Sequence, residues 1–210
     1  MGTVFDTGIG LSCQGICVVR GGNTILEDVS IDLEPGSINV LQGSNGSGKT
    51  SFLRILSGNA KPTAGTVLLT GDEAGVANLS EATLMLGHLN GLKHSMTVKE
   101  TITFWIQLYG SGSDVTQLSK DLELLPIYDQ RVGTLSAGQK RRVAIARAVI
   151  SERPIWLLDE PTTSLDRETK ERIENQIEKH KSRNGLAVIA THDPITLSAA
   201  RFLSLESTAQ

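Results

Sequence analysis

The chain has 210 residues, of which 39% are hydrophobic and 20% charged, and its formal net charge at pH 7 is -3. This composition is typical of one α/β domain with a sizeable core, and it excludes a disordered or fibrous chain. The slightly acidic balance offers no overall attraction for nucleic acid, because nucleic-acid-binding domains usually carry a strong basic excess.

The start of the chain and its cysteines bear on the cellular compartment. The first fifteen residues lack the basic start and the continuous apolar run of a signal peptide. Uncharged segments such as residues 101–113 are too short and too polar to cross a bilayer, so we expect any membrane role to come through a partner. Cys13 and Cys17 lie four apart in a predicted strand, too far along an extended chain for a disulfide, which favours a reducing compartment.

Residues 15–43 alternate β-branched and polar side chains and are broken by Gly-Gly and Pro-Gly. This pattern predicts a short antiparallel meander that leads into the strand INVL, residues 38–41. The strand runs into the glycine-rich segment GSNGSGKT, residues 43–50. From Lys49 to Leu56 the apolar spacing predicts a helix, with Gly58 as its C-terminal stop.

The segment GSNGSGKT matches the phosphate-loop pattern G-x-x-x-x-G-K-[ST] in the required strand–loop–helix context. Its backbone N–H groups can surround phosphate oxygens, Lys49 can place a charge on the β- and γ-phosphates, and the Thr50 hydroxyl can ligate magnesium. The alternative is a Gly-Ser loop that only caps a helix. The expected ATP-binding residues are Gly43, Ser44, Asn45, Gly46, Ser47, Gly48, Lys49 and Thr50, and Lys49 is also expected to act in catalysis.

Beyond the phosphate loop, the sequence predicts two further strands and then a helical stretch over 97–130, where Thr97 and Glu100 have the spacing of a capping box. The remaining order is a helix over about 139–151, a strand over 155–159, a helix over about 167–181, a strand over 186–191, and then a last helix and a short strand. We therefore expect one α/β domain, 1–210. It comprises a P-loop NTPase core with an N-terminal antiparallel β subdomain (about 1–90 and 140–210) and an inserted α-helical lobe (about 91–139).

Two strand ends carry candidate catalytic groups. Asp159 and Glu160 follow a buried strand, IWLLD, in PIWLLDEPTTSLD. We expect Asp159 to hold Mg²⁺, through water, and Glu160 to polarise the attacking water as a general base. His192 ends another apolar strand, where it could reach the γ-phosphate and that water. The alternatives are that Asp159 and Glu160 only cap the next helix and that His192 has a structural role.

The segment LSAGQKRR, residues 135–142, predicts a second anion-facing loop. Lys140, Arg141 and Arg142 lie in the first turn of a helix, where the helix dipole disfavours cations unless an anion or an acidic neighbour is close. Our interpretation is that Ser136 and Gly138 meet the γ-phosphate of a nucleotide held by a second copy. Two copies would then form a two-fold homodimer with two ATP molecules between them. The alternative is a plain helix N-cap.

Taken in order, GSNGSGKT, LSAGQ, WLLDEP, SLD and THD resemble the motifs of the ATP-binding cassette (ABC) ATPases across essentially the whole chain. The resemblance implies an ATP-driven subunit that uses Mg²⁺ and whose helical lobe docks a transmembrane partner. Asp166, in SLD, matches the residue through which the two nucleotide sites communicate. Two positions depart from the pattern. His88 replaces the usual magnesium-sensing Gln, and Arg20 replaces the adenine-stacking aromatic, although a guanidinium plane can also stack on a base.

Within that family, the stretches GHLNGLK, LSAGQKRRVAIAR and RPIWLLDEP resemble the ATP-binding subunits of the cytochrome c maturation (haem exporter) system. This implies a transmembrane permease subunit and a haem-handling membrane subunit as partners, with hydrolysis driving haem delivery or release of a haem-loaded chaperone. It also implies a peripheral position on the cytoplasmic face of the inner membrane, or on the matrix face in an organelle.

Three alternatives remain open on the sequence. The first is an ABC transporter ATPase with a different cargo, which the motifs do not encode. The second is a non-transport ATPase acting on nucleic acid, but residues 51–134 contain neither the heptads nor the cysteine clusters of that class. We expect no nucleic-acid partner. The third is a nucleotide-binding scaffold without turnover, against which both Glu160 and His192 argue.

Overall fold

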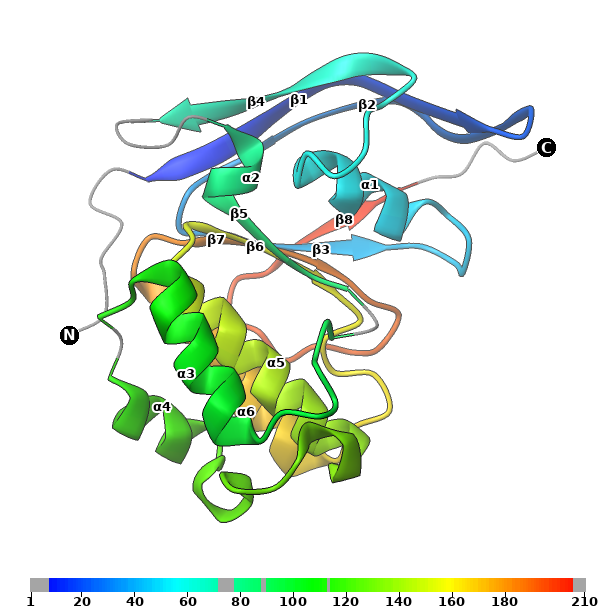
Figure 1. The fold of residues 1–210 in the computed structure, drawn as a ribbon. Helices are drawn as coiled ribbons and strands as arrows, with labels where there is room; N and C mark the ends of the chain where they lie inside the picture. Colours follow the sequence, from blue (N-terminus) through cyan, green and yellow to red (C-terminus); the bar gives the residue numbers. More distant parts are fainter. Residues whose placement is uncertain (1–7, 72–77, 88–89, 113, 206–210) are drawn as a thin grey trace.

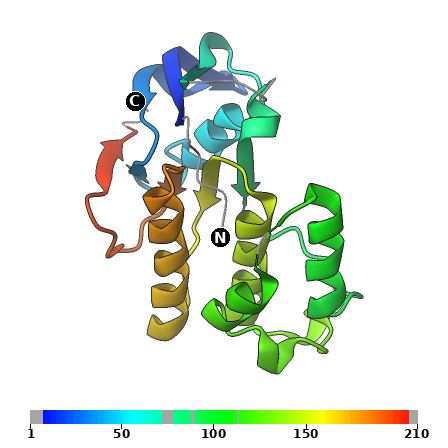
Figure 2. The same cartoon turned by 90° about the vertical axis from the view of Figure 1, so that its left-hand side faces the viewer.

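The computed structural model describes residues 8–71, 78–87, 90–112 and 114–205. A three-stranded sheet, in the order β2-β1-β4, lies over a five-stranded sheet in the order β5-β6-β7-β3-β8, and Figure 1 shows helix α1 between them. Helices α3, α5 and α6 cover the opposite face of the larger sheet (Figures 1 and 2). The strands are β1 Ile9–Arg20, β2 Asn23–Leu33, β3 Ile38–Gln42, β4 Ala64–Gly71, β5 Thr83–Leu86, β6 Ile155–Asp159, β7 Leu186–Ala190 and β8 Arg201–Ser204. The helices are α1 Lys49–Leu56, α2 Leu79–Ala82, α3 Val98–Tyr109, α4 Val115–Asp121, α5 Ala137–Ser151 and α6 Arg167–Ser182, with 3-10 turns η1 Leu125–Ile127 and η2 Val132–Thr134.

The smaller sheet is the predicted N-terminal antiparallel subdomain. Strands β1 and β2 form a hairpin in which Arg20 faces Asn23, and the turn residues Gly21 and Gly22 have φ values of 56° and 82°. Left-handed conformations at both turn positions match the twist of a hairpin, and glycine adopts them without steric cost. Strand β4 pairs with the other edge of β1. The predicted strand INVL forms β3, which instead joins the parallel sheet between β7 and β8.

The parallel sheet is buried on both faces, as the apolar runs of its strands predict. In β6, Trp156 and Leu158 pack on the side of α3, α5 and α6, whereas Ile155 and Leu157 pack on the side of α1 and the antiparallel sheet. The alternation follows from the two-residue period of a strand, which points successive side chains to opposite faces. One sheet thus lies between two hydrophobic cores.

The helical lobe follows β5 and contains α3, α4, η1 and η2. The predicted capping box is confirmed, since the Thr97 side chain accepts from the Glu100 N–H and the Glu100 carboxylate accepts from the Thr97 N–H. Helix α5 begins at Ala137, two residues before the expected start. The division at 91–139 stays a prediction. Among the described helices, none is both long and apolar enough to cross a membrane.

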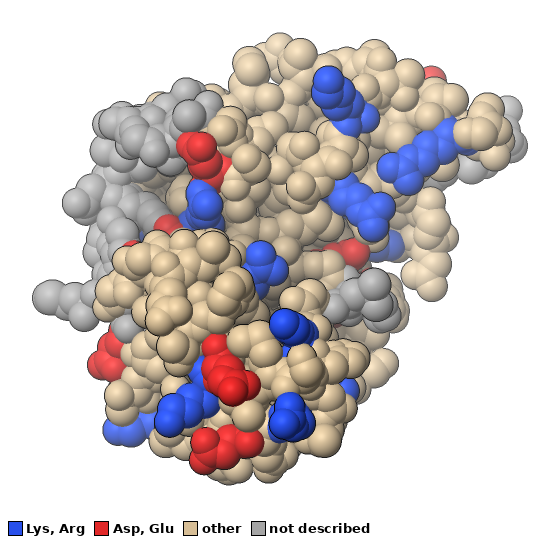
Figure 3. Space-filling view, in the orientation of Figure 1, with Lys and Arg blue, Asp and Glu red and all other residues tan. Residues whose placement is uncertain are grey.

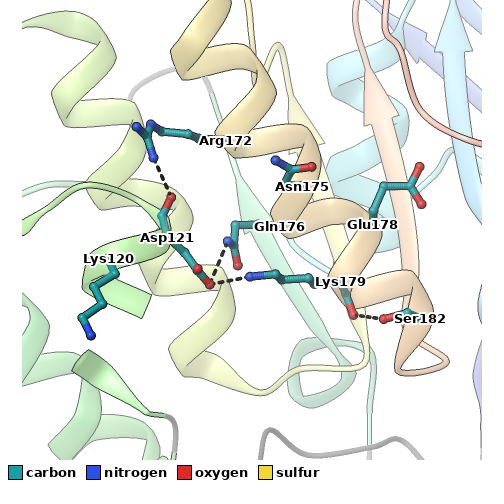
Figure 4. A pocket seen from close by; sticks show the side chains of 8 residues that line it. All are labelled: Lys120, Asp121, Arg172, Asn175, Gln176, Glu178, Lys179 and Ser182. Atoms are coloured by element: carbon teal, nitrogen blue, oxygen red, sulfur yellow. Dashed lines mark hydrogen bonds and ion pairs between the residues drawn. The ribbon is translucent and has the colours of Figure 1, made fainter. Parts of the chain in front are cut away.

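A polar contact joins the lobe to the core at the hollow between α4 and α6 (Figure 4). Asp121, the last residue of α4, accepts from Lys179 and Gln176 of α6, and its carbonyl oxygen accepts from Arg172. Burial opposes ionisation of Asp121, but the hydrogen bonds, led by that of Lys179, leave its pKa below the ordinary value. The hollow contains none of the predicted site residues. Its lining consists of Lys120, Asp121, Arg172, Asn175, Gln176, Glu178, Lys179 and Ser182.

The prediction of a last helix before the final strand is wrong. Residues 192–200 are turns and irregular structure, and β8 follows as expected. The N–H groups of Thr196 and Ser198 donate to the carboxylates of Glu174 and Glu178 on α6. Ile195, between Pro194 and Thr196, packs on the core beneath. The side-chain acceptors on α6 satisfy these N–H groups, so the segment does not need helical hydrogen bonds to pair them.

Both cysteines lie in β1 as free thiols, which confirms that they do not pair. Cys13 is buried, and this burial, together with the nearby charge of Asp32, raises the pKa of its thiol to about 12. The thiol therefore stays protonated and behaves as a small core side chain.

Candidate nucleotide-binding site

The phosphate loop connects β3 to α1, and its glycines have the conformations that the motif requires. Gly43, Gly46 and Gly48 have φ values of 156°, 87° and 90°, which L side chains rarely adopt. A Cβ atom at Gly48 would also stand 2.8 Å from the Leu26 side chain on β2. The loop is therefore both wound tightly and pressed against the antiparallel sheet at the start of α1, and glycine-rich loops at a helix start are suited to bind anions through backbone N–H groups.

Lys49 and Ser47 provide two polar groups inside this loop. Lys49 is 8% exposed, and its ammonium donates to the carbonyl oxygens of Gly43 (2.7 Å) and Ser44 (2.9 Å). The Ser47 hydroxyl is buried and has no hydrogen-bond partner among the described residues. A buried hydroxyl without a partner is costly, and a phosphate oxygen is the kind of acceptor that would satisfy it. The loop residues thus fit the triphosphate predicted from the motif.

Thr50 and Asp159 meet at the ends of α1 and β6. The Thr50 hydroxyl donates to a carboxylate oxygen of Asp159 at 2.9 Å, although 109 positions separate the two residues. Mg²⁺ binds hard oxygen ligands and often uses one or two protein oxygens together with phosphate and water. The pair fits that chemistry. Among the described residues, no group of three or more His, Cys, Asp or Glu side chains forms a protein-only metal site. His88, the third predicted magnesium residue, lies outside the described residues.

The structure places His192 directly against Glu160, whereas the sequence predicted that His192 reaches the γ-phosphate and the water at Glu160. Nδ1 of His192 lies 2.8 Å from Oε1 of Glu160, and the other carboxylate oxygen accepts from Thr163 (2.5 Å) and Thr191 (3.1 Å). Burial opposes the charge on Glu160, yet these three hydrogen bonds hold its pKa below the ordinary value. The same contact raises the pKa of His192. The carboxylate is therefore ionised and its orientation is defined on both oxygens.

Thr163 and Thr191 are partners of Glu160 that the sequence motifs did not single out. Both residues were visible in the motifs PTTSLD and ATHD, but a threonine after a strand has many structural roles. The backbone of Glu160 adds a further feature that sequence could not reveal, since its φ of 50° lies in the left-handed region. For a residue with a side chain this conformation costs roughly 1–2 kcal/mol, and such strain clusters at functional sites.

The signature residues form a second group. Ser136 caps α5 in a capping box with Gln139, in agreement with the alternative of an N-cap. Gly138 lies beside α6, with a Cβ position 3.8 Å from a carboxylate oxygen of Asp166, and Asp166 caps α6 through Thr169. The hydrogen bond from the Thr169 N–H lowers the pKa of Asp166. Figures 1 and 2 place the N-terminal ends of α5 and α6 together on the lower side, away from the phosphate loop above them.

The cations at the start of α5 are accounted for within the chain. Arg142 forms an ion pair with Glu123 of the lobe and also donates to the Leu122 carbonyl. Arg141 points into the core, and the Lys140 ammonium lies 3.4 Å from the Gly133 carbonyl. Because Glu123 is the acidic neighbour that the helix dipole requires, these cations give no argument for a phosphate of a second copy.

Arg20 stands at the end of β1, exposed and next to the hairpin turn. On the face shown in Figure 3, lysine and arginine predominate in the upper right, where Figure 1 shows this hairpin and the phosphate loop. Over the lobe, in the lower part, both signs of charge occur together. The side that carries the phosphate loop is thus locally basic in a chain of net charge -3, which favours an anionic ligand there.

Residues 26–163 match the ABC transporter family. The chain belongs to this family and is an ABC-type ATP-binding subunit, as the order of its motifs predicts. Such a subunit binds nucleotide, hydrolyses ATP and works with membrane partner subunits.

Among individual relatives, the chain is similar to the cytochrome c biogenesis ATP-binding export protein CcmA of Roseobacter denitrificans, with 41% identity over 93% of this chain and 90% of that protein. The CcmA of Rhizobium meliloti is 36% identical over 93% of this chain and 97% of its own length. In fold, the chain is similar to a putative ABC transporter ATP-binding protein from Pyrococcus furiosus, with a TM-score of 0.77, 21% identity and coverage of 93% and 97% of the two chains. That likeness confirms the predicted fold class.

Proposed function

We propose that the chain is the ATP-hydrolysing subunit of a haem exporter for cytochrome c biogenesis, in which hydrolysis drives haem delivery or the release of a haem-loaded chaperone. The observation that carries the proposal is the similarity to CcmA proteins over more than nine-tenths of the chain. Expression of this chain in a bacterium that lacks its own CcmA provides the test. Recovery of c-type cytochromes supports the assignment, whereas an intact, expressed chain that restores none would favour another cargo.

The geometry of the site supports a specific role for each residue around the bound nucleotide. The N–H groups of the phosphate loop and the Lys49 ammonium bind the β- and γ-phosphates. Thr50 and Asp159 hold Mg²⁺, which supplies charge neutralisation at the phosphates when bound. The ionised Glu160 accepts a proton from the attacking water, and His192 orients that carboxylate. Arg20 stacks on the adenine through its guanidinium plane.

The two separate groups of residues support a homodimer. The phosphate-loop group and the signature group lie apart within one chain, so Ser136, Gly138 and Asp166 serve the nucleotide of the second copy, and two ATP molecules lie at the interface. The substitution Glu160→Gln tests this arrangement because it retains ATP while removing the base. Light scattering should show an ATP-dependent dimer of Glu160→Gln, and Lys49→Ala should stay monomeric as the control. A Glu160→Gln chain that remained monomeric with saturating ATP, even beside its membrane partner, would contradict the arrangement.

The helical lobe provides the contact with the transmembrane permease subunit. Phe104 and Leu108 are 50% and 57% exposed and lie one turn apart on α3, forming an apolar pair on the surface of the lobe. The complex also contains a haem-handling membrane subunit, and it sits on the cytoplasmic face of the inner membrane or the matrix face in an organelle. Replacing both residues with Ser should reduce co-purification with the permease subunit. Leu68→Ser, on the exposed surface of β4, is the matched control.

A further inference from the structure

Arg141 is a buried cation to which none of the sequence motifs assigns a role. It is the fifth residue of α5 and is 5% exposed. Burial lowers the pKa of its guanidinium to about 10, opposed by the nearby charges of Asp159 and Glu160, so the group remains charged at neutral pH. A buried charge is costly unless its donors are well satisfied, and the partners of Arg141 therefore indicate what it does.

The guanidinium donates to four oxygen atoms on two other segments of the chain. Its Nη2 donates to the Asp159 carbonyl at 2.8 Å and its Nε to the Pro161 carbonyl at 3.0 Å. Its Nη1 donates to the Gly87 carbonyl at 3.1 Å and to Oδ1 of Asn90 at 2.5 Å. A planar fork with five donors can hold several acceptors at once, which the single ammonium of a lysine cannot reproduce.

Two of these carbonyls belong to the residues on either side of Glu160. The Glu160 backbone is in the left-handed region, with φ of 50°, and its N–H donates to the Ala190 carbonyl on β7 at 2.8 Å. A strained backbone persists only where its surroundings hold it. Here β7 holds the N–H of Glu160, and the Arg141 guanidinium holds the carbonyls before and after it.

We infer that Arg141 is a positioning residue for Glu160. It fixes the peptide frame from which the Glu160 carboxylate reaches its partners, and it ties that frame to the end of β5 and to α5. This inference rests on the proposed role of Glu160 as the base. Arg141 touches no reacting atom in this arrangement, so its removal acts on turnover rather than on nucleotide binding.

The test compares Arg141→Lys with Arg147→Lys in the full chain assembled with its membrane subunits. Arg147 is the matched control because it is also on α5 and partly buried, and it donates to the Tyr109 hydroxyl of α3 instead. We expect Arg141→Lys to lower kcat by about 100-fold, a loss typical of a catalytic group displaced by about 1 Å. Its KM for ATP should stay within about twofold, as expected when ground-state binding is retained. Arg147→Lys should change kcat little.

A double variant separates a positioning role from a general loss of stability. If Arg141 acts through Glu160, then adding Arg141→Lys to Glu160→Gln should cause no further loss of kcat. An additional loss in the double variant, a joint change of kcat and KM, or a wild-type kcat in Arg141→Lys would each overturn the inference. Should Arg141→Lys fail to fold, Arg141→Gln keeps one amide donor without a buried charge and gives the same comparison.

The same set of variants distinguishes this inference from the proposed function. Full turnover in Glu160→Gln would remove Glu160 as the base and refute the proposed mechanism itself. Loss of turnover in Glu160→Gln together with normal turnover in Arg141→Lys would refute the inference alone.

Discussion

His180 makes the stability of the fold depend on pH in a way that can be worked out from its surroundings. The ring is 4% exposed and stacks on Trp156 with a centroid distance of 4.0 Å. Its Nε2 lies 3.2 Å from the Pro154 carbonyl and 3.3 Å from the Leu186 carbonyl, so this nitrogen carries the proton of the neutral ring. Burial lowers the pKa of His180 from 6.5 to about 4, only partly opposed by those two carbonyls.

The direction of this pH dependence follows from proton binding to His180 in the folded and unfolded states. Between pH 6.5 and about 4 the unfolded chain holds a proton on His180 and the folded chain does not, so stability falls as the pH falls through this range. With those two pKa values, the free energy of unfolding should drop by about 1 kcal/mol between pH 7.5 and pH 5.5 through this residue alone. For a domain of this size the loss corresponds to a decrease in Tm of roughly 2–4 °C.

The measurement is urea unfolding of wild type and His180→Phe at several pH values, followed by circular dichroism. Phe keeps an aromatic ring against Trp156 and does not titrate. It loses the hydrogen bonds of the His180 Nε2, at a cost of about 1 kcal/mol that is independent of pH, while the Pro154 carbonyl still accepts from the Leu186 N–H. The difference in stability between the two chains should narrow as the pH falls to 5.5. His94→Gln, at an exposed histidine, is the control and should follow wild type. Equal pH dependence in His180→Phe and wild type would refute the reasoning.

Three further predictions concern the nucleotide site. Lys49→Ala should weaken ATP binding by about 10- to 150-fold, the loss of one charge-assisted contact, and isothermal titration with unchanged affinity would count against the phosphate loop. Arg20→Ala should raise the Kd for ATP more than that for inorganic triphosphate, whereas equal effects would argue against stacking. Because Glu160 raises the pKa of His192, that ion pair stabilises the fold below pH 6.5 and is lost as the pH rises through the raised pKa. In Glu160→Gln, NMR titration should give His192 a lower pKa, and an unchanged value would show that the pair does not form.

Local patterns in the sequence were sufficient for the phosphate loop, the capping box at Thr97 and most helices and strands. In each case the determining interactions lie within a few residues, as in the glycines that permit positive φ and the side chain that caps its own helix. The strand-end positions of Glu160 and His192 were also predictable, because parallel strands deliver their carboxyl ends to one edge of a sheet.

Contacts between distant segments could be decided only by the tertiary structure. Residues 192–200 do not form the predicted helix, and N–H groups in this segment donate to carboxylates on α6. The Thr50 hydroxyl donates to Asp159 although 109 positions separate the two residues. Arg141 has the same helix-start position as its neighbours in sequence, yet it points inward to hold the strand end beside Glu160. The periodicity of apolar residues along the chain predicts which face of a helix or strand is buried. The partner of a buried polar side chain depends on how the helices and strands pack together. Such a group must form its hydrogen bonds with whichever donors and acceptors the tertiary structure places beside it.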